Sequence, residues 1–151
     1  KIRSINEDIL DSKPWTRGLF DSILAANMII NKSYEQKNRI ALVILDSTLE
    51  IGLKEYLVFQ SGKTYKETKL QDIFDTINSG RRNVIKAVRE YTLKETKYDK
   101  LWNKVEFYYR KRCDLIHSSS TPTILDPEID EYKKVIQTIF SSLFGLVFDV
   151  S

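Results

Sequence analysis

The chain contains few of the residues that build covalent cross-links or metal sites. Its 151 residues include one cysteine, Cys113, and one histidine, His117. A single cysteine excludes an internal disulfide and any cysteine-rich zinc site, and a metal site made by the protein alone would have to use carboxylates. We therefore expect no structural metal, and this cysteine usage fits a protein of the reducing cytoplasm.

Glycine and proline are also scarce, and long apolar runs are missing. Five glycines and three prolines provide few breaks, so the secondary-structure elements should be long. The longest apolar runs, IALVIL and LFGLVF, fall well short of the roughly 18 residues that span a bilayer, and no membrane partner is expected. Lys1 is not an initiating methionine and no signal-peptide pattern follows, which leaves open that the sequence is a fragment of a longer chain.

Charge is distributed unevenly along the chain. A composition of 42% apolar and 30% charged residues is that of a soluble globular protein, and the net charge is +3. The segment from Arg81 to Arg112 holds 11 lysines and arginines against four acids, a net charge of +7, so the remainder carries −4. This asymmetry predicts one basic surface able to bind a polyanion, unless the lysines merely cover two solvated helix faces.

Helical periodicity dominates the sequence. The segment 17–36 repeats Leu19, Ile23, Ala26 and Ile30 on one stripe, and the segment 37–59 is apolar on most faces, which places it at the centre of a bundle. The expected helices cover residues 17–36, 37–59, 69–80, 81–95, 98–118 and 125–148. We predict an all-α, up-and-down helical bundle of five or six helices that forms a single domain over residues 1–151.

Local signals predict where these helices begin and end. Residues 61–68 (SGKTYKET) should form a loop that turns at Ser61-Gly62, and Gly80 should cap the C-terminus of the helix before it. Residues 119–124 (SSTPTI) interrupt the chain before the last helix. That helix is expected to begin with Asp126 as its N-cap, Pro127 in the first helical position and Glu128 in the first turn.

The stretch EFYYRKRCDLIHSSS, residues 106–120, ends a long helix in the basic segment and runs into a serine-rich loop. Within it, four residues separate Arg112 from His117. This pattern resembles the R-x4-6-H motif of the HEPN superfamily (higher eukaryotes and prokaryotes nucleotide-binding). Those domains are small helical bundles with the motif on a late helix, and the acid-bearing apolar segment LDSTLEIGLKEYL also fits. Six residues separate Arg110 from His117, which satisfies the loosest spacing, but four is the commoner one.

The resemblance implies a function and roles for the motif residues. Active HEPN domains are endoribonucleases that need no metal or cofactor, commonly act as homodimers, and often belong to prokaryotic defence or toxin systems with an antitoxin or regulatory partner. By resemblance, His117 is the general acid/base and Arg112 the phosphate clamp. These residue types suit RNA cleavage through the 2′-hydroxyl, because histidine exchanges protons near neutrality and a guanidinium holds two phosphoryl oxygens.

Cys113 departs from the family pattern. The position after the arginine is usually Asn, Asp or His, and a thiol is a weak hydrogen-bonding substitute. Asp114 is a possible replacement, although one helical step moves it about 100° around the axis. The alternative function is therefore a catalytically inactive HEPN-like module that binds nucleotide or a partner protein.

Helix geometry constrains how Arg112 and His117 work together. In an unbroken helix they are about 140° and about 7.5 Å apart, so either the helix loosens before His117 or two chains share the site across a two-fold axis. Four nearby aromatic residues line such an interface, stack on bases or simply fill the core: Trp102, Phe107, Tyr108 and Tyr109.

Two acids, Asp46 and Glu50, stand four residues apart on the central apolar helix, and Glu50 is a supporting candidate together with Arg110, Cys113 and Asp114. A buried acid needs a partner, and Arg112 is a candidate partner for Glu50, unless Glu50 lies on the surface. The alternative to a catalytic site is a surface ion pair with a nearby histidine, because Arg110, Asp114 and His117 share one helix face.

Overall fold

The computed structural model describes residues 2–64, 70–117 and 123–148, and within these ranges all regular structure is helical. The elements are α1 (Ile2–Ile5), α2 (Glu7–Ser12), α3 (Thr16–Ile30), α4 (Lys37–Thr64), α5 (Leu70–Ile77), α6 (Arg81–Arg89), the 3-10 helix η2 (Thr96–Tyr98), α7 (Asp99–His117) and α8 (Asp126–Phe144). The predicted all-α bundle is confirmed. The six expected helices correspond to α3–α8, whereas the short helices α1 and α2 were not predicted because neither is long enough to show a periodic apolar stripe.

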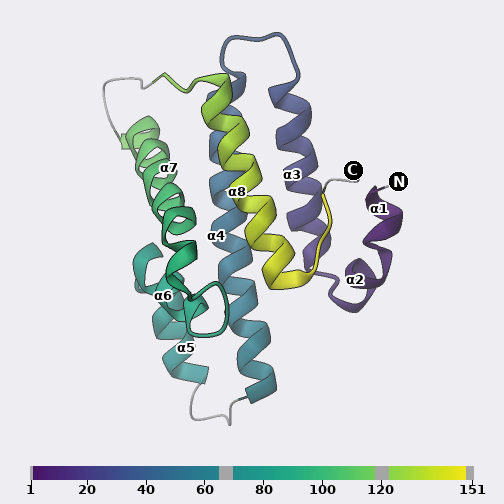
Figure 1. Ribbon diagram of the computed structural model, residues 1–151, viewed down its shortest axis with the longest axis vertical. Helices are drawn as coiled ribbons and strands as arrows, with labels where there is room; N and C mark the ends of the chain where they lie inside the picture. The colour runs from purple at the N-terminus through teal and green to yellow at the C-terminus, as the bar shows by residue number, and fades with distance from the viewer. Residues whose placement is uncertain (1, 65–69, 118–122, 149–151) are drawn as a thin grey trace.

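Helix α4 is the centre of the bundle. It packs against α3 and α8 and also against α5, α6 and α7. Figure 1 shows the long helices α3, α4, α7 and α8 running alternately up and down, with α5 and α6 at one end and α1 and α2 beside α3. A helix in contact with five neighbours must be apolar on most of its surface, which agrees with the all-round apolar character of its sequence.

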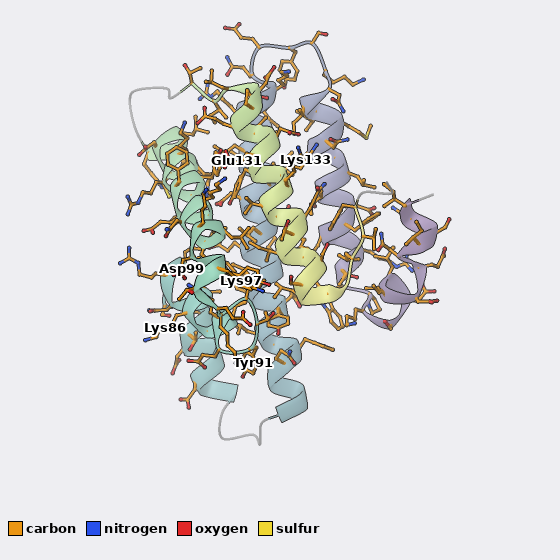
Figure 2. The ribbon with its side chains drawn as sticks, in the orientation of Figure 1. Lys86, Tyr91, Lys97, Asp99, Glu131 and Lys133 are labelled. Atoms are coloured by element: carbon orange, nitrogen blue, oxygen red, sulfur yellow. The ribbon has the colours of Figure 1, made fainter. Side chains whose placement is uncertain are left out.

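The core is built from the apolar stripes that the sequence predicts. On α4 the predicted seam is buried along its length, and Leu19, Ile23 and Ala26 of α3 are buried opposite it. The residues of the α4 seam are Leu42, Leu45, Leu49, Leu53 and Tyr56. Charged side chains lie outside, as Lys86 and Lys97 do at the α6–α7 side of the molecule in Figure 2.

A buried asparagine joins the two ends of the described chain. The Asn6 side chain donates to the carbonyl oxygens of Ile2 (2.9 Å) and Val147 (2.7 Å), and it accepts a hydrogen bond from the Val147 N–H (2.8 Å). Three hydrogen bonds satisfy this buried amide, as burial requires. The segment after α8 is thereby fixed beside α1 and α2, where Figure 1 places it.

Two of the predicted boundaries involving glycine are wrong. Helix α4 continues through Thr64, so the backbone does not turn at Ser61-Gly62; one glycine costs a helix only about 1 kcal/mol, and no proline stops it there. Residues 65–68 of the predicted loop lie outside the described residues. Helix α5 ends at Ile77, and Gly80 instead precedes α6 with φ 109°, in the left-handed region that glycine adopts readily.

The start of α8 is shifted by one residue from the prediction. Leu125 is the N-cap, and Asp126 is already the first helical residue. The Glu128 carboxylate accepts from the Leu125 N–H (3.0 Å), while Asp126 accepts from the Asn38 side chain of α4 (2.7 Å). Asp126 therefore ties α8 to α4 instead of capping its own helix. Residues 119–122 of the predicted interruption lie outside the described residues.

We predict opposite effects from adding one methyl group at two helical glycines. At Gly52, in the middle of α4, a Cβ would overlap the buried ring of Phe140, whereas at Gly18 in α3 it would meet nothing within 4 Å. Gly52→Ala should lower the free energy of unfolding by about 1–3 kcal/mol through overpacking. Gly18→Ala should raise it by about 0.5–1 kcal/mol, because alanine loses less backbone entropy on folding. Urea unfolding of both variants checks the pair, and equal effects would contradict it.

Candidate functional site

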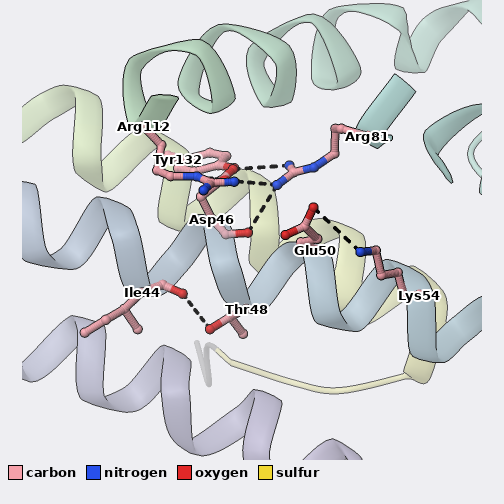
Figure 3. A network of polar contacts seen from close by, with 8 residues as sticks. All are labelled: Ile44, Asp46, Thr48, Glu50, Lys54, Arg81, Arg112 and Tyr132. Atoms are coloured by element: carbon pink, nitrogen blue, oxygen red, sulfur yellow. Dashed lines mark hydrogen bonds and ion pairs between the residues drawn. The ribbon is translucent and has the colours of Figure 1, made fainter. Parts of the chain in front are cut away.

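The buried carboxylate of Asp46 is the centre of a polar network (Figure 3). Arg81 donates from Nη1 to Oδ1 (3.2 Å) and from Nη2 to Oδ2 (2.9 Å). Arg112 donates from Nε to Oδ2 (2.8 Å), and the Tyr132 hydroxyl donates to Oδ1. One carboxylate therefore accepts from three side chains, and Arg112, the candidate phosphate clamp, is one of them.

Four helices meet at this network. Asp46 comes from α4, Tyr132 from α8, Arg112 from the penultimate turn of α7, and Arg81 is the first residue of α6, just after Gly80. The Asp46 side chain has no exposed surface, and the Arg81 and Arg112 side chains are 4% and 19% exposed. Because an unpaired buried charge costs several kcal/mol, the Asp46 carboxylate fixes the positions of both guanidinium groups.

The electrostatics keep both arginines charged. Burial lowers the pKa of each guanidinium, but the hydrogen bonds and charge of Asp46 outweigh it, and the pKa values of Arg81 and Arg112 are raised. Burial and the charge of Asp46 raise the pKa of Tyr132 well above its usual range, so its hydroxyl stays a neutral donor. The two guanidinium groups and one carboxylate carry a net charge of +1.

Tyr109 links the two arginines on the side away from Asp46. Its ring lies 4.5 Å from the Arg81 guanidinium carbon and 5.3 Å from that of Arg112. The neighbouring Cys113 side chain, one turn further along α7, and burial raise the pKa of Tyr109. Cys113, at the departure from the family pattern, therefore influences the ring that lies beside Arg112.

His117 occupies a different environment from Arg112. It is the last residue of α7 and is exposed, and no hydrogen bond or ion pair joins its side chain to another residue that the structure describes. Helix α7 is regular through His117, so it does not loosen between the two motif residues. Arg112 points inward to Asp46, and within one chain the structure does not bring the two side chains together.

The supporting candidates divide between the network and the surface. Arg112 pairs with Asp46, so the predicted pairing with Glu50 is wrong; Glu50 lies one turn further along α4 and faces Lys54 at 3.9 Å. Arg110 is exposed and pairs with Glu106 (2.9 Å). Asp114 is exposed and does not take the place of a polar group beside Arg112.

Contacts between α7 and α8 set the orientation of Arg112. Lys111 pairs with Glu128 (2.7 Å), and Glu131 pairs with Lys104 and accepts from the Tyr108 hydroxyl (3.1 Å). The pKa of Glu131 is lowered, first by the hydrogen bond from Lys104. Because these contacts line one face of α7, they direct the neighbouring face, with Arg112, toward Asp46.

The four aromatic residues of the sequence-predicted cluster have separate environments. Trp102 and Tyr108 are buried in the core, and Tyr108 stacks on Tyr132 with ring centroids 4.6 Å apart. Phe107 is 49% exposed, and Tyr109 is half-buried against the arginines. The core explanation therefore applies to two of the four rings.

Arg81 and Tyr132 are the network members that sequence reasoning missed. Tyr132 lies on the apolar stripe of α8, where the sequence does not distinguish it from any other core residue. Arg81 is one of many basic residues in its segment, so nothing in the sequence marks it as buried. The only signal was Asp46 itself, because an acid on an apolar helix face needs partners.

The described residues contain no group of three or more histidines, cysteines and acids close enough to hold a metal ion. None of the described helices has the length and apolar character needed to cross a membrane.

Comparison of the chain with protein-family models, with curated proteins and with solved structures finds no match in any of the three. The function of the site is therefore inferred from its own residues and geometry, together with the resemblance of the Arg112–His117 spacing to the HEPN motif.

We predict that Asp46→Asn lowers the free energy of unfolding by about 3–5 kcal/mol, because it leaves two buried guanidinium groups without their counter-charge. The matched control is Glu50→Gln, one turn along the same helix, where the partly exposed pair with Lys54 should contribute less than about 1 kcal/mol. Chemical denaturation followed by circular dichroism measures both. Equal losses in the two variants would show that Asp46 is not the centre of the network.

Proposed function

We propose that this chain is a HEPN-type RNA-binding domain that cuts RNA without a metal ion and acts in a prokaryotic, cytoplasmic defence or toxin system. The observation that carries the proposal is the state of Arg112. Its Nε is held by the buried Asp46 carboxylate, yet 19% of its side chain is exposed. An arginine that is oriented from inside and reaches the surface suits a phosphate clamp.

The chemistry assigned to the two motif residues is a phosphoryl transfer within the RNA. The 2′-hydroxyl attacks the adjacent phosphorus, its proton goes to a base, and the bond to the 5′-oxygen of the next nucleotide breaks as that oxygen receives a proton. His117, exposed at the end of α7, is available for either proton transfer. Arg112 stabilises the charge on the phosphoryl oxygens.

The basic segment supports RNA as the polyanion. Exposed lysines and arginines extend from α6 through η2 to the first half of α7, among them Lys86, Lys97 and Lys100. Some of the arginines are engaged by acids, as Arg89 is by Asp99 (2.7 Å), but most of these lysines are not neutralised by an ion pair in the described residues. Such a surface binds phosphates without reading sequence.

The separation of Arg112 and His117 in one chain supports a homodimer in which each copy contributes part of the site. Helix α4 carries an exposed apolar stripe next to the network: Ile40, Val43, Ile51 and Val58. Glu50 lies between the buried Asp46 and this stripe around the helix. A second copy seated on the stripe would lie beside the Arg112 network, and exposed apolar patches mark such interfaces.

The second candidate function is a catalytically inactive HEPN-like module that binds nucleotide or a partner protein. One observation favours it: the residue after Arg112 is Cys113, whose thiol is a weaker hydrogen-bonding group for a phosphate than the Asn, Asp or His usual at this position. The same basic surface and homodimer would then serve binding alone.

We predict that the purified chain cleaves mixed single-stranded RNA in EDTA, leaving 2′,3′-cyclic phosphate ends. His117→Ala should lower the rate by about 100-fold or more, because general acid–base catalysis contributes about that factor. Gel electrophoresis of labelled RNA measures the rate, and the folded state of the variant is checked by its circular dichroism.

Arg110→Ala is the matched control for the choice of arginine. It removes an exposed positive charge seven residues before His117 and, at saturating RNA, should lower the cleavage rate only modestly, since Arg110 is not in the Asp46 network. Cleavage that needs a divalent metal, or that persists in His117→Ala, would refute the nuclease. Binding of RNA with no cleavage at all would leave the inactive module as the function.

We predict that Ile51→Glu converts a dimer to a monomer without unfolding it, since Ile51 is 54% exposed and a carboxylate cannot be buried unpaired at an interface. Met28→Glu, at a 64% exposed position on α3, is the control and should leave the assembly unchanged. Size-exclusion chromatography with light scattering gives both masses. A monomeric unaltered chain would contradict the shared site.

A further inference from the structure

A cavity of about 340 Å³ lies between α6 and α7, and Arg81 is one of the residues that line it. This volume is at the lower end of the range for small-molecule pockets, about 300–1,000 Å³. Its walls combine aromatic, aliphatic, amide and charged groups: Arg81, Arg82, Ile85, Trp102, Asn103, Glu106, Tyr109 and Arg110.

Two aromatic rings in the cavity lining, Trp102 and Tyr109, are held in place by neighbouring groups. Trp102 is 5% exposed, and its indole N–H donates to the Leu93 carbonyl (3.1 Å), which fixes the ring. The Tyr109 ring is held against the guanidinium groups of Arg81 and Arg112. Rings fixed in this way, with the Ile85 side chain, form a preorganised slot for a planar group.

Polar groups in the cavity have unused hydrogen-bonding capacity. The amide of Asn103 is exposed, and no hydrogen bond joins it to another side chain in the part of the chain that the structure describes. Arg81, by contrast, is nearly completely buried, and its Nε, which has no hydrogen-bond partner among the described residues, is itself buried. An amide supplies both a donor and an acceptor, the combination that reads the edge of a base.

The mouth of the cavity carries two exposed arginines that share one acid. Arg82 and Arg110 each donate to the same oxygen of Glu106, both at 2.9 Å. The hydrogen bond from Arg82 and the charge of Arg110 lower the pKa of Glu106. Two guanidinium groups against one carboxylate leave a net charge of +1, so a phosphate can bind both arginines while Glu106 turns to solvent.

We propose that this cavity binds a nucleotide, with the base between the Trp102 and Tyr109 walls, Asn103 on the base edge and the phosphate on Arg82 and Arg110. The nucleotide is part of a single-stranded RNA or a free mononucleotide, which present the same groups. That RNA is the larger ligand rests on the proposed function. Binding of a nucleotide in the cavity does not depend on whether the chain cleaves RNA.

The position of the cavity relates it to the motif. Arg110 at its mouth lies about 10 Å along the α7 axis from His117, seven residues further on. Tyr109 contacts both the cavity and the Arg112 guanidinium. A strand whose base occupies the cavity therefore passes close to the motif, and the cavity would select which phosphate is presented to it.

The test measures binding through the fluorescence of Trp102. The chain has two tryptophans, and Trp15→Phe removes the other; its indole N–H is buried without a hydrogen bond, so the replacement should be tolerated. His117→Ala in the same protein prevents cleavage. Short single-stranded oligoribonucleotides and the four nucleoside monophosphates are titrated separately, and anisotropy of labelled RNA gives an independent Kd.

We expect RNA to quench Trp102, and Asn103→Ala and Arg82→Ala to weaken binding by about five- to tenfold, the size of one lost base or phosphate contact. Lys32→Ala is the control, because it removes an exposed charge after α3, outside both the cavity and the basic segment, and should change the Kd less than about twofold. If the mononucleotides bind and Asn103→Ala weakens their binding as well, the ligand is a free nucleotide. If only the oligoribonucleotides bind, the ligand is RNA.

The proposal is overturned if Asn103→Ala weakens binding no more than Lys32→Ala, or if saturating RNA leaves Trp102 fluorescence unchanged. Cleavage that depends on His117 with an unaltered Kd in Asn103→Ala would reject the cavity and keep the nuclease. Binding that depends on Asn103 without any cleavage would reject the nuclease and keep the cavity.

Discussion

The carboxylate of Asp46 cannot be buried at the centre of this bundle without the groups that surround it. Burial of an ion is expensive, and it is tolerated here because two guanidinium groups and a phenol hydroxyl occupy its oxygens. Those donors come from α6, α7 and α8, so one charge on α4 dictates how three other helices approach. An apolar core alone would allow α7 to rotate or slide by small steps, whereas this network allows one arrangement.

That constraint decides the relation between the two motif residues. With Arg112 turned inward to Asp46 and α7 regular to its end, His117 must face another direction. A helix that loosened before His117 could have joined them within one chain, but the backbone shows no such break. The arrangement that remains for Arg112 and His117 to touch one phosphate is the proposed dimer, in which two chains share the site. The apolar stripe of α4 beside Glu50 offers a surface for the second chain.

The sequence predicts those parts of the fold that depend on periodicity. The six main helices and the α4 seam follow from apolar spacing, because burial of one stripe is the dominant local constraint. Helix ends were less predictable: α4 passes through Gly62, and Asp126 bonds to Asn38 in another helix instead of capping its own. The network partners Arg81 and Tyr132 were not predictable, because an ion pair between residues 35 positions apart and a hydrogen bond between residues 86 positions apart leave no periodic trace.

Arg81 connects the buried network with the cavity between α6 and α7. Its Nη atoms are committed to Asp46, while the residue also lines the cavity and its guanidinium lies over the Tyr109 ring. Because the buried Asp46 carboxylate holds the Arg81 guanidinium, the whole Arg81 side chain is fixed, and the part of the cavity wall that it forms is rigid. Binding there would not need to order Arg81 or Tyr109, which lowers the entropic cost of association. The same buried charge that orients Arg112 thus also preorganises the cavity next to it.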